Sequence, residues 1–86
     1  MPQISAFFGI VIEMFWREHG PPHFHATYAE YEAVIDLESF DIIRGSLPNR
    51  AAALVRDWSE QNHRALMENW ERCQCLKHPI PIPPLE

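Results

Sequence analysis

The fold is decided by residues 23–37, which read HFHATYAEYEAVIDL. Apolar and polar side chains alternate along residues 23–28 and again from residue 31 onward, and a period of two is typical of β-strands that have one buried face. Because the buried face sets the register, we pair the two strands by matching their apolar side chains. The resulting antiparallel hairpin places three pairs opposite each other: Phe24 with Ile35, Ala26 with Ala33, and Tyr28 with Tyr31.

The segments on either side extend this sheet. Residues 4–17 are rich in β-branched and aromatic side chains and predict one long strand. The Gly-Pro-Pro sequence at residues 20–22 predicts a turn after it. Residues 42–44 favour a short fourth strand. Matching the apolar faces of the first two strands pairs Trp16 with Phe24, Met14 with Ala26, and Ile12 with Tyr28.

The C-terminal half predicts a helix. Pro48 suits a first helical turn, and residues 49–73 contain no Gly or Pro. A series of large or polar side chains recurs there at intervals of four residues. Since a helix has 3.6 residues per turn, each interval rotates the series by about 40° around the helix axis, and four intervals rotate it by about 160°. We therefore expect a kink or break near residues 61–63, or a helix whose far end meets a second partner. The recurring residues are Leu54, Trp58, Asn62, Leu66 and Trp70.

The predicted fold class is α+β: an antiparallel three- or four-stranded meander followed by a long C-terminal helix, kinked or broken, that packs on one face. In this prediction residues 1–74 form a single domain. Residues 75–86 form a proline-rich tail, which we expect to be extended or disordered.

Composition narrows the classes of function. The chain has 86 residues and a formal net charge of −5, with one Lys and no dense basic patch, which disfavours nucleic-acid binding. It has no apolar run that could span a bilayer and no secretory signal, so we expect no membrane association and a cytoplasmic location. Small domains gain stability by association. The drift of the helical series carries Trp70 away from the face that Leu54 and Trp58 define, so we expect Trp70 to need a separate burial partner and the chain to form a homo-oligomer.

Three of the five histidines lie within residues 19–25. His23 and His25 are two residues apart on a predicted strand and therefore share a face. The predicted register places Arg17 and Asp36 on either side of His23, and Glu13 lies on the same face. A carboxylate beside an imidazole is typical of both general bases and metal sites, and an arginine can hold an anion.

Three interpretations of this cluster stay open. The imidazoles could be structural groups at a proline-led turn, or they could belong to a ligand- or partner-binding surface made of His19, His23, His25, Arg17, Glu13 and Trp70. The third is a catalytic or metal site, with His23, His25, Arg17 and Asp36 as catalytic candidates. A metal would need His19 or Glu13 as a third ligand beside His23 and His25. We predict no metal and no cofactor.

Several short motifs together resemble one family, the short bacterial and archaeal proteins known as domain of unknown function 4160. The most specific is Pro21-Pro22-His23-Phe24-His25, and the others are Ile4-Ser5-x-Phe7-Phe8-Gly9-Ile10, Tyr28-x-x-Tyr31, Leu47-Pro48-x-Arg50 and Asn69-Trp70-Glu71. The resemblance covers residues 4–71. The family has no settled activity, but the resemblance implies a toxin–antitoxin-like gene pair.

The predicted function is accordingly a small cytoplasmic protein-interaction module, one component of such a pair, whose partner is another small protein encoded by the adjacent gene. The alternative is a metal-binding protein, or a small hydrolase or nuclease, that uses His19, His23 and His25. Whether the chain is an enzyme is left open at this point.

Overall fold

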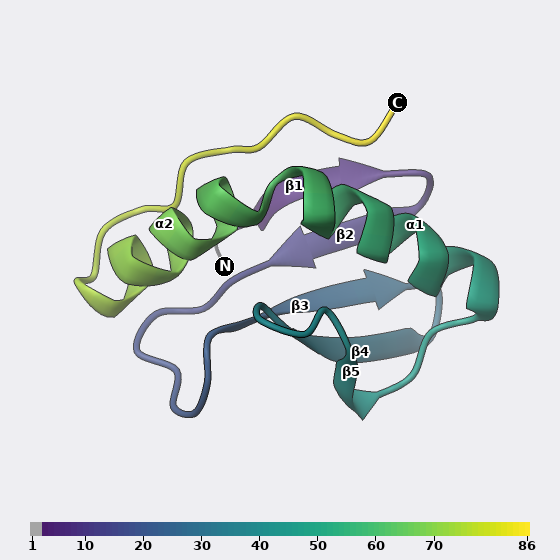
Figure 1. Cartoon of the computed structure of the whole chain (residues 1–86), viewed down its shortest axis with the longest axis horizontal. Helices are drawn as coiled ribbons and strands as arrows, with labels where there is room; N and C mark the ends of the chain where they lie inside the picture. Colours follow the sequence, from purple (N-terminus) through teal and green to yellow (C-terminus); the bar gives the residue numbers. More distant parts are fainter. Residues whose placement is uncertain (1–2) are drawn as a thin grey trace.

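The structure, a computed structural model of the chain, describes residues 3–86. Five antiparallel strands form one sheet in which each strand pairs with the next in sequence (Figure 1). The strands are β1 (Gln3–Phe7), β2 (Ile10–Glu13), β3 (His23–Tyr28), β4 (Tyr31–Asp36) and β5 (Ile42–Gly45). The α+β class and the antiparallel meander are confirmed, with one strand more than the three or four predicted.

The additional strand arises because residues 4–17 do not form one long strand. Phe8 and Gly9 both have positive φ angles, of 49° and 82°, and they form a two-residue turn between β1 and β2. Two consecutive residues with positive φ are typical of a turn whose twist matches that of a hairpin. Strand β2 ends at Glu13, so residues 14–22 form a loop.

The two predicted registers have different outcomes. Between β3 and β4 the pairing is as predicted, from His23 opposite Asp36 to Tyr28 opposite Tyr31. Between β2 and β3 the prediction is wrong by two residues, since Ile12 lies opposite Ala26 and not opposite Tyr28. A shift of two residues leaves the same side chains on the buried face, and for this reason the apolar pattern could not distinguish the two pairings.

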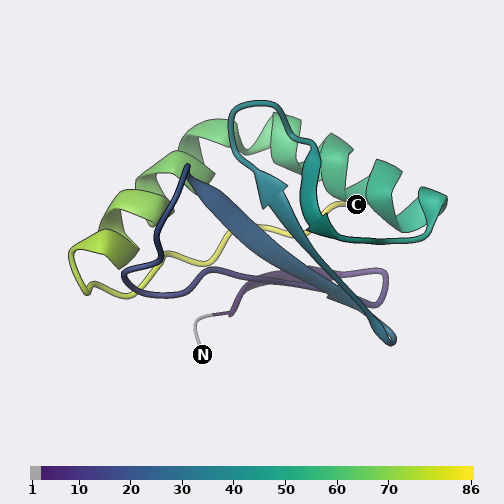
Figure 2. The same ribbon diagram turned by 90° about the horizontal axis from the view of Figure 1, so that it is seen from below.

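The helical region consists of two helices, α1 (Asn49–Gln61) and α2 (His63–Gln74), and not of one long helix. They are interrupted at Asn62, within the segment where the rotating stripe predicted a kink or break. Figure 2 shows them meeting at an angle above one face of the twisted sheet. Between the helices and the sheet lies a core with fully buried side chains, among them Ile12, Phe24, Trp58 and Leu66.

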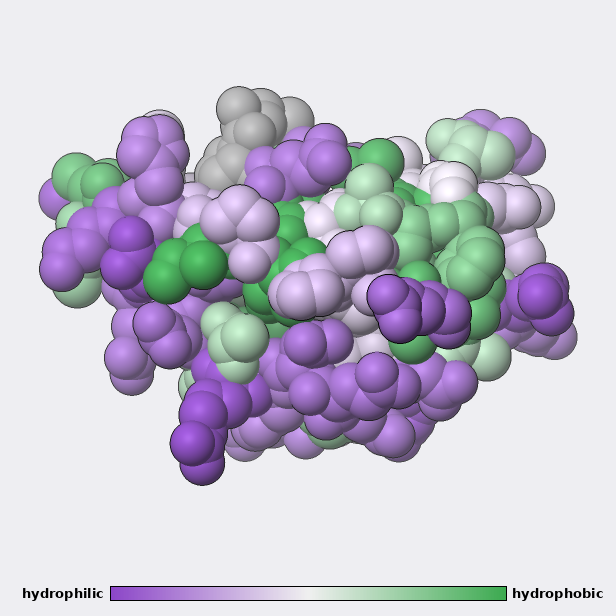
Figure 3. All heavy atoms as spheres, turned by 90° about the horizontal axis from the view of Figure 1, so that it is seen from above, coloured by the Kyte–Doolittle hydropathy of each residue, from purple (hydrophilic) through white to green (hydrophobic). Residues whose placement is uncertain are grey.

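The proline-rich tail is extended and packs against the rest of the chain. The Ile82 amide donates a hydrogen bond to the carbonyl of Ile4 in β1, and its side chain belongs to the core. Trp58 Nε1 donates to the carbonyl of Pro83. Figure 3 views the molecule from the side along which the tail runs in Figure 1. On this side apolar residues form a band, and hydrophilic residues flank it.

Trp70 is 7% exposed and lies within the chain's own core cluster. The expectation that it needs a separate burial partner is therefore wrong, and it gives no support to a homo-oligomer. Among the helices of residues 3–86, none is long and apolar enough to cross a membrane.

Candidate metal centre

Strand β3 directs His23 and His25 to one face of the sheet. Phe24 and Ala26, which alternate with them, are fully buried on the opposite face, as the sequence predicted. Pro22 lies immediately before the strand, and its carbonyl accepts a hydrogen bond of 2.9 Å from the amide of Leu37, after β4. The backbone that carries both imidazoles is therefore fixed by the neighbouring strand.

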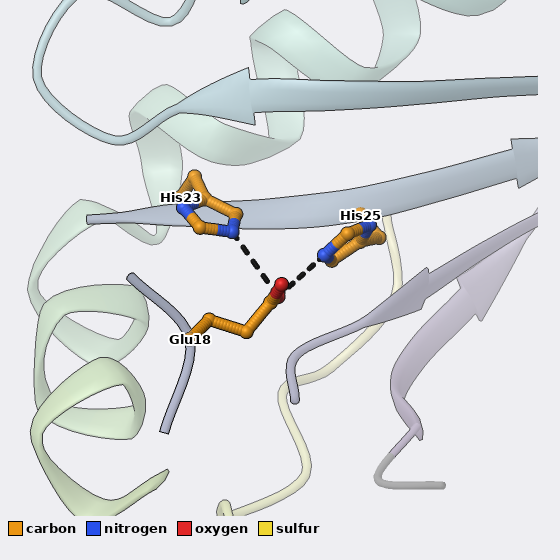
Figure 4. Close-up of side chains that lie close together, drawn as sticks. All are labelled: Glu18, His23 and His25. Atoms are coloured by element: carbon orange, nitrogen blue, oxygen red, sulfur yellow. Dashed lines mark hydrogen bonds and ion pairs between the residues drawn. The ribbon is translucent and has the colours of Figure 1, made fainter. Parts of the chain in front are cut away.

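The third member of the cluster is Glu18, which comes from the loop before β3 (Figure 4). Its Oε1 atom lies 3.1 Å from His23 Nε2 and 2.5 Å from His25 Nε2. One potential ligand atom from each of the three residues lies within 4.8 Å of the other two. Among residues 3–86 this is the only group of three or more His, Cys, Asp or Glu with such spacing.

Contacts with the C-terminal region position the loop of Glu18. The Gln74 side chain, at the end of α2, donates a hydrogen bond of 3.2 Å to the carbonyl of Glu18. Trp16 Nε1 donates one of 3.1 Å to the carbonyl of Lys77. Arg17 has a φ of 54°, in the left-handed region, and so turns the chain just before Glu18. The carboxylate thus reaches the histidines from a loop that hydrogen bonds hold against the C-terminal region.

The ring of His23 has a defined orientation. Its Nδ1 lies 2.8 Å from the carbonyl oxygen of Pro21, and a carbonyl only accepts hydrogen bonds, so we assign the proton to Nδ1. In the neutral ring the lone pair of Nε2 then faces Glu18. Histidines that bind metals commonly donate their second ring N–H to a backbone carbonyl in this way.

The position of His23 Nε2 beside the Glu18 carboxylate is electrostatically unfavourable when the His23 ring is neutral. A neutral His23 would direct a lone pair at a carboxylate oxygen of Glu18, which already accepts from His25. Two electron-rich atoms at that distance repel each other unless a proton or a cation lies between them. The cluster therefore favours binding of a positive charge.

Burial of the cluster strengthens its preference for a positive charge, because little water can reach these side chains. The side chains of His23 and His25 are 8% and 17% exposed, and that of Glu18 is 29% exposed. His23 packs against Trp70 with ring centroids 5.0 Å apart, and His25 packs edge-on against Phe15 at 4.5 Å. Burial raises the pKa of Glu18, but hydrogen bonds and charge interactions with His25 and His23 outweigh it, so the pKa is lowered and the ligand stays a carboxylate.

The chemistry of the three groups fits a divalent transition metal. Two imidazole nitrogens and one carboxylate oxygen bind Zn²⁺, Fe²⁺ and related ions, and three protein ligands leave coordination positions open for water or a substrate. Bonds of about 2.0–2.1 Å at tetrahedral angles place ligand atoms about 3.4 Å apart. The contact between His23 and Glu18 is close to that spacing, whereas His25 and Glu18 would have to separate by about 1 Å.

The residues predicted from the sequence are only partly brought together. His19 is exposed and lines a hollow together with Glu18, His23 and His25, but it is not in the group of three. Glu13 lies opposite His25 in β2, as a neighbour on the shared face, and is likewise outside that group.

Two other predicted residues have different surroundings from those expected. Asp36 lies opposite His23, but its Oδ2 accepts hydrogen bonds from the amides of Glu38 and Ser39 and so stabilises the turn after β4. Arg17 is exposed in the loop and does not extend β2, so its predicted place in the strand beside His23 is wrong.

Sequence reasoning missed Glu18. The available signal was a carboxylate five residues before His23, in a loop closed by two prolines. The predicted long strand concealed it, because a strand through residue 17 would have directed this loop elsewhere.

Comparison with known proteins places the chain in a family. A family model described as domain of unknown function (DUF4160) matches residues 9–71. The chain belongs to this family. The matched range contains Glu18, His23 and His25, and the resemblance seen in the sequence is confirmed. No curated protein and no solved structure matches the chain.

Proposed function

We propose that this protein binds a divalent transition-metal ion through Glu18, His23 and His25. The observation that carries the proposal is the convergence of two imidazole Nε2 atoms on one carboxylate oxygen, in a setting that holds the His23 lone pair toward it. The two histidine side chains are mostly buried, and their rings are packed against aromatic neighbours. His23 and Glu18 are already close to the spacing of metal ligands, so the main adjustment on metal binding is the separation of His25 from Glu18.

The test is metal-dependent stability. Ligand at about 100 times its dissociation constant stabilises a folded protein by about 2.7 kcal/mol, which raises the melting temperature of a domain of this size by about 10 °C or more. We expect Zn²⁺ or Co²⁺ to produce this shift in the wild type and not in Glu18→Gln, which keeps the shape of the side chain but removes its charge. Glu13→Gln is the matched control, because Glu13 lies on the same face opposite His25.

The cysteines provide a competing explanation that the experiment must separate. Cys75 is exposed, and Cys73 and His78 are close to it in sequence. A Cys75→Ser variant should therefore keep the metal-induced shift. Equal shifts in the wild type and Glu18→Gln, or the absence of a shift in both, would show that the cluster is not a metal site.

A separate observation supports the predicted interaction module as a second proposal. Strand β5 is the last strand of the sheet, all four of its residues are exposed, and Ile43 is 52% exposed. An exposed strand at a sheet edge is a template for pairing with another chain. We propose that this edge receives the protein partner, the product of the adjacent gene in a toxin–antitoxin-like pair.

Co-expression with the neighbouring gene and co-purification test this second proposal. We expect a stable complex with the wild type and weakened binding for Ile43→Lys, since a lysine at a sheet edge opposes pairing. Phe8→Ser is the control, because Phe8 is 61% exposed at a different turn. Equal retention by both variants, or no complex at all, would remove the proposal.

A further inference from the structure

We infer that the hollow beside the cluster binds a small oxyanion, a carboxylate or a phosphate, held between the metal ion and Arg44. This inference rests on the proposed metal binding and names the class of ligand that such a centre would take.

The first step is the place of Arg44 on the sheet. His25 lies opposite Val34, and Val34 lies opposite Arg44, so these three residues form one row across β3, β4 and β5. Directly paired residues project from the same face of a sheet. Adjacent strands are about 4.8 Å apart, so the backbone of Arg44 is about 10 Å from that of His25. An arginine side chain extended toward β3 spans much of that distance.

The second step is the hollow itself, with a volume of about 340 Å³. The three cluster residues line one part of it and Arg44 another, while Val34, which is 8% exposed, lies between them. Arg44 is the only Lys or Arg among the residues that line it. A ligand in this space would therefore contact the metal ion and the guanidinium together.

The third step is that Arg44 is available. Within residues 3–86 its guanidinium takes part in none of the hydrogen bonds or ion pairs of the structure, whereas Arg56 pairs with both Asp41 and Glu60. In the part of the chain that the structure describes, the carboxylates of β4 on this face do not engage Arg44 either: Asp36 accepts hydrogen bonds from its own turn, and Glu32 is in none of the ion pairs. This leaves an unpaired cation facing the open side of the cluster.

The metal ion at one end of the hollow and Arg44 at the other favour the same class of ligand. A metal held by three protein ligands accepts an oxygen of a carboxylate or phosphate at an open position. A guanidinium presents a planar fork of donors that matches two oxygens of the same groups. A volume of about 340 Å³ is at the low end for ligand pockets, which limits the ligand to a small molecule.

The experiment uses the full chain loaded with Co²⁺, whose visible absorption reports changes in its ligands. We expect acetate or methylphosphonate to change the spectrum saturably, and the anion that acts at lower concentration identifies the preferred class. Arg44→Gln should weaken the apparent affinity for the anion about tenfold without changing Co²⁺ affinity, because a hydrogen-bonded ion pair is lost at a partly exposed site. Arg44→Lys, which keeps the charge but not the fork, should lie between.

Arg64→Gln is the control, since Arg64 is exposed on α2, outside the residues that line the hollow. Failure of Co²⁺ to bind the wild type would overturn the metal proposal and this inference with it. Normal Co²⁺ binding with an equal anion response in Arg44→Gln, or with no anion response, would overturn this inference alone.

Discussion

The imidazole of His23 lies against the indole of Trp70, with ring centroids 5.0 Å apart and ring planes inclined by 53°. This contact joins the candidate metal centre to α2, across the boundary between sheet and helices. Both residues are 7% exposed. His23 therefore contributes to the packing of the fold as well as to the cluster.

Replacing His23 by alanine should cost about 2–3 kcal/mol of unfolding free energy. The substitution removes a packed ring and leaves the Pro21 carbonyl without its hydrogen-bond partner. His19→Ala, at an exposed position, should change stability by no more than about 0.5 kcal/mol. Urea denaturation of the metal-free proteins measures both. Identical midpoints for His23→Ala and the wild type would contradict the packing role.

Gly45 should be intolerant of alanine. Its φ is +75°, and an added Cβ would lie 2.0 Å from the carbonyl oxygen of Glu32 in β4, so the backbone of the edge strand would have to move. We expect a loss of at least about 2–3 kcal/mol for Gly45→Ala. Gly20 is the control: its φ is +91°, but a Cβ there meets nothing within 4 Å.

Gly20→Ala isolates the cost of the left-handed backbone, which should be about 1 kcal/mol. Thermal melts of Gly45→Ala and Gly20→Ala separate the cost of the steric clash from the cost of the left-handed backbone. If Gly45→Ala is no less stable than Gly20→Ala, the close approach of β4 and β5 at this point is incorrect.

The hairpin from His23 to Asp36 was predictable because its period of two is regular and its register follows from local pairing. The hairpin of β1 and β2 was missed because its turn consists of Phe8 and Gly9, and only the glycine signals a turn. Aromatic residues are common in strands, so Phe8 in a run of β-branched neighbours favoured a continuous strand.

The histidine part of the candidate site followed from strand periodicity, but Glu18 did not. Its position depends on the left-handed conformation of Arg17 and on a hydrogen bond from Gln74, which is 56 residues away in sequence. Contacts of that separation leave no periodic pattern. The packing of the tail on β1 and Trp58 was hidden for the same reason, since proline-rich composition predicts the conformation of the tail and not where it packs.

Acid should weaken the turn after β4 through Asp36. The pKa of Asp36 is lowered from its usual value of 3.8, chiefly by the backbone hydrogen bond from Ser39, which burial only partly opposes. A carboxyl whose pKa is lower in the folded state stabilises the fold above its unfolded pKa, and this stabilisation is lost as the pH falls through the folded pKa. Asp36→Asn should therefore be less stable than the wild type at pH 6, and the difference should shrink below pH 4.

Urea midpoints measured from pH 3 to pH 6 test this dependence. Asp57→Asn serves as the control, because Asp57 is exposed on α1. A stability difference between Asp36→Asn and the wild type that stays constant over this range would show that the charged form of Asp36 has no special role.

The tail should be required for full stability because Asn69 ties it to α2. Asn69 is 1% exposed, and its side chain both donates to the carbonyl of Ile80, at 2.8 Å, and accepts from the amide of Ile80, at 2.7 Å. Asn69→Ala breaks both bonds and leaves two part-buried backbone groups unpaired, so we expect a loss of about 2–3 kcal/mol. Glu68→Ala, at the neighbouring exposed position, should change stability by no more than about 0.5 kcal/mol.

Limited proteolysis provides the second measurement. Release of the tail in Asn69→Ala should expose residues 79–86 to cleavage at a protease concentration that leaves the wild type and Glu68→Ala intact. It should also uncover the indole of Trp58, whose Nε1 donates to Pro83, and so shift tryptophan fluorescence to longer wavelength. A variant that melts with the wild type and resists cleavage equally would mean that the tail is held by Ile82 in the core and not by Asn69.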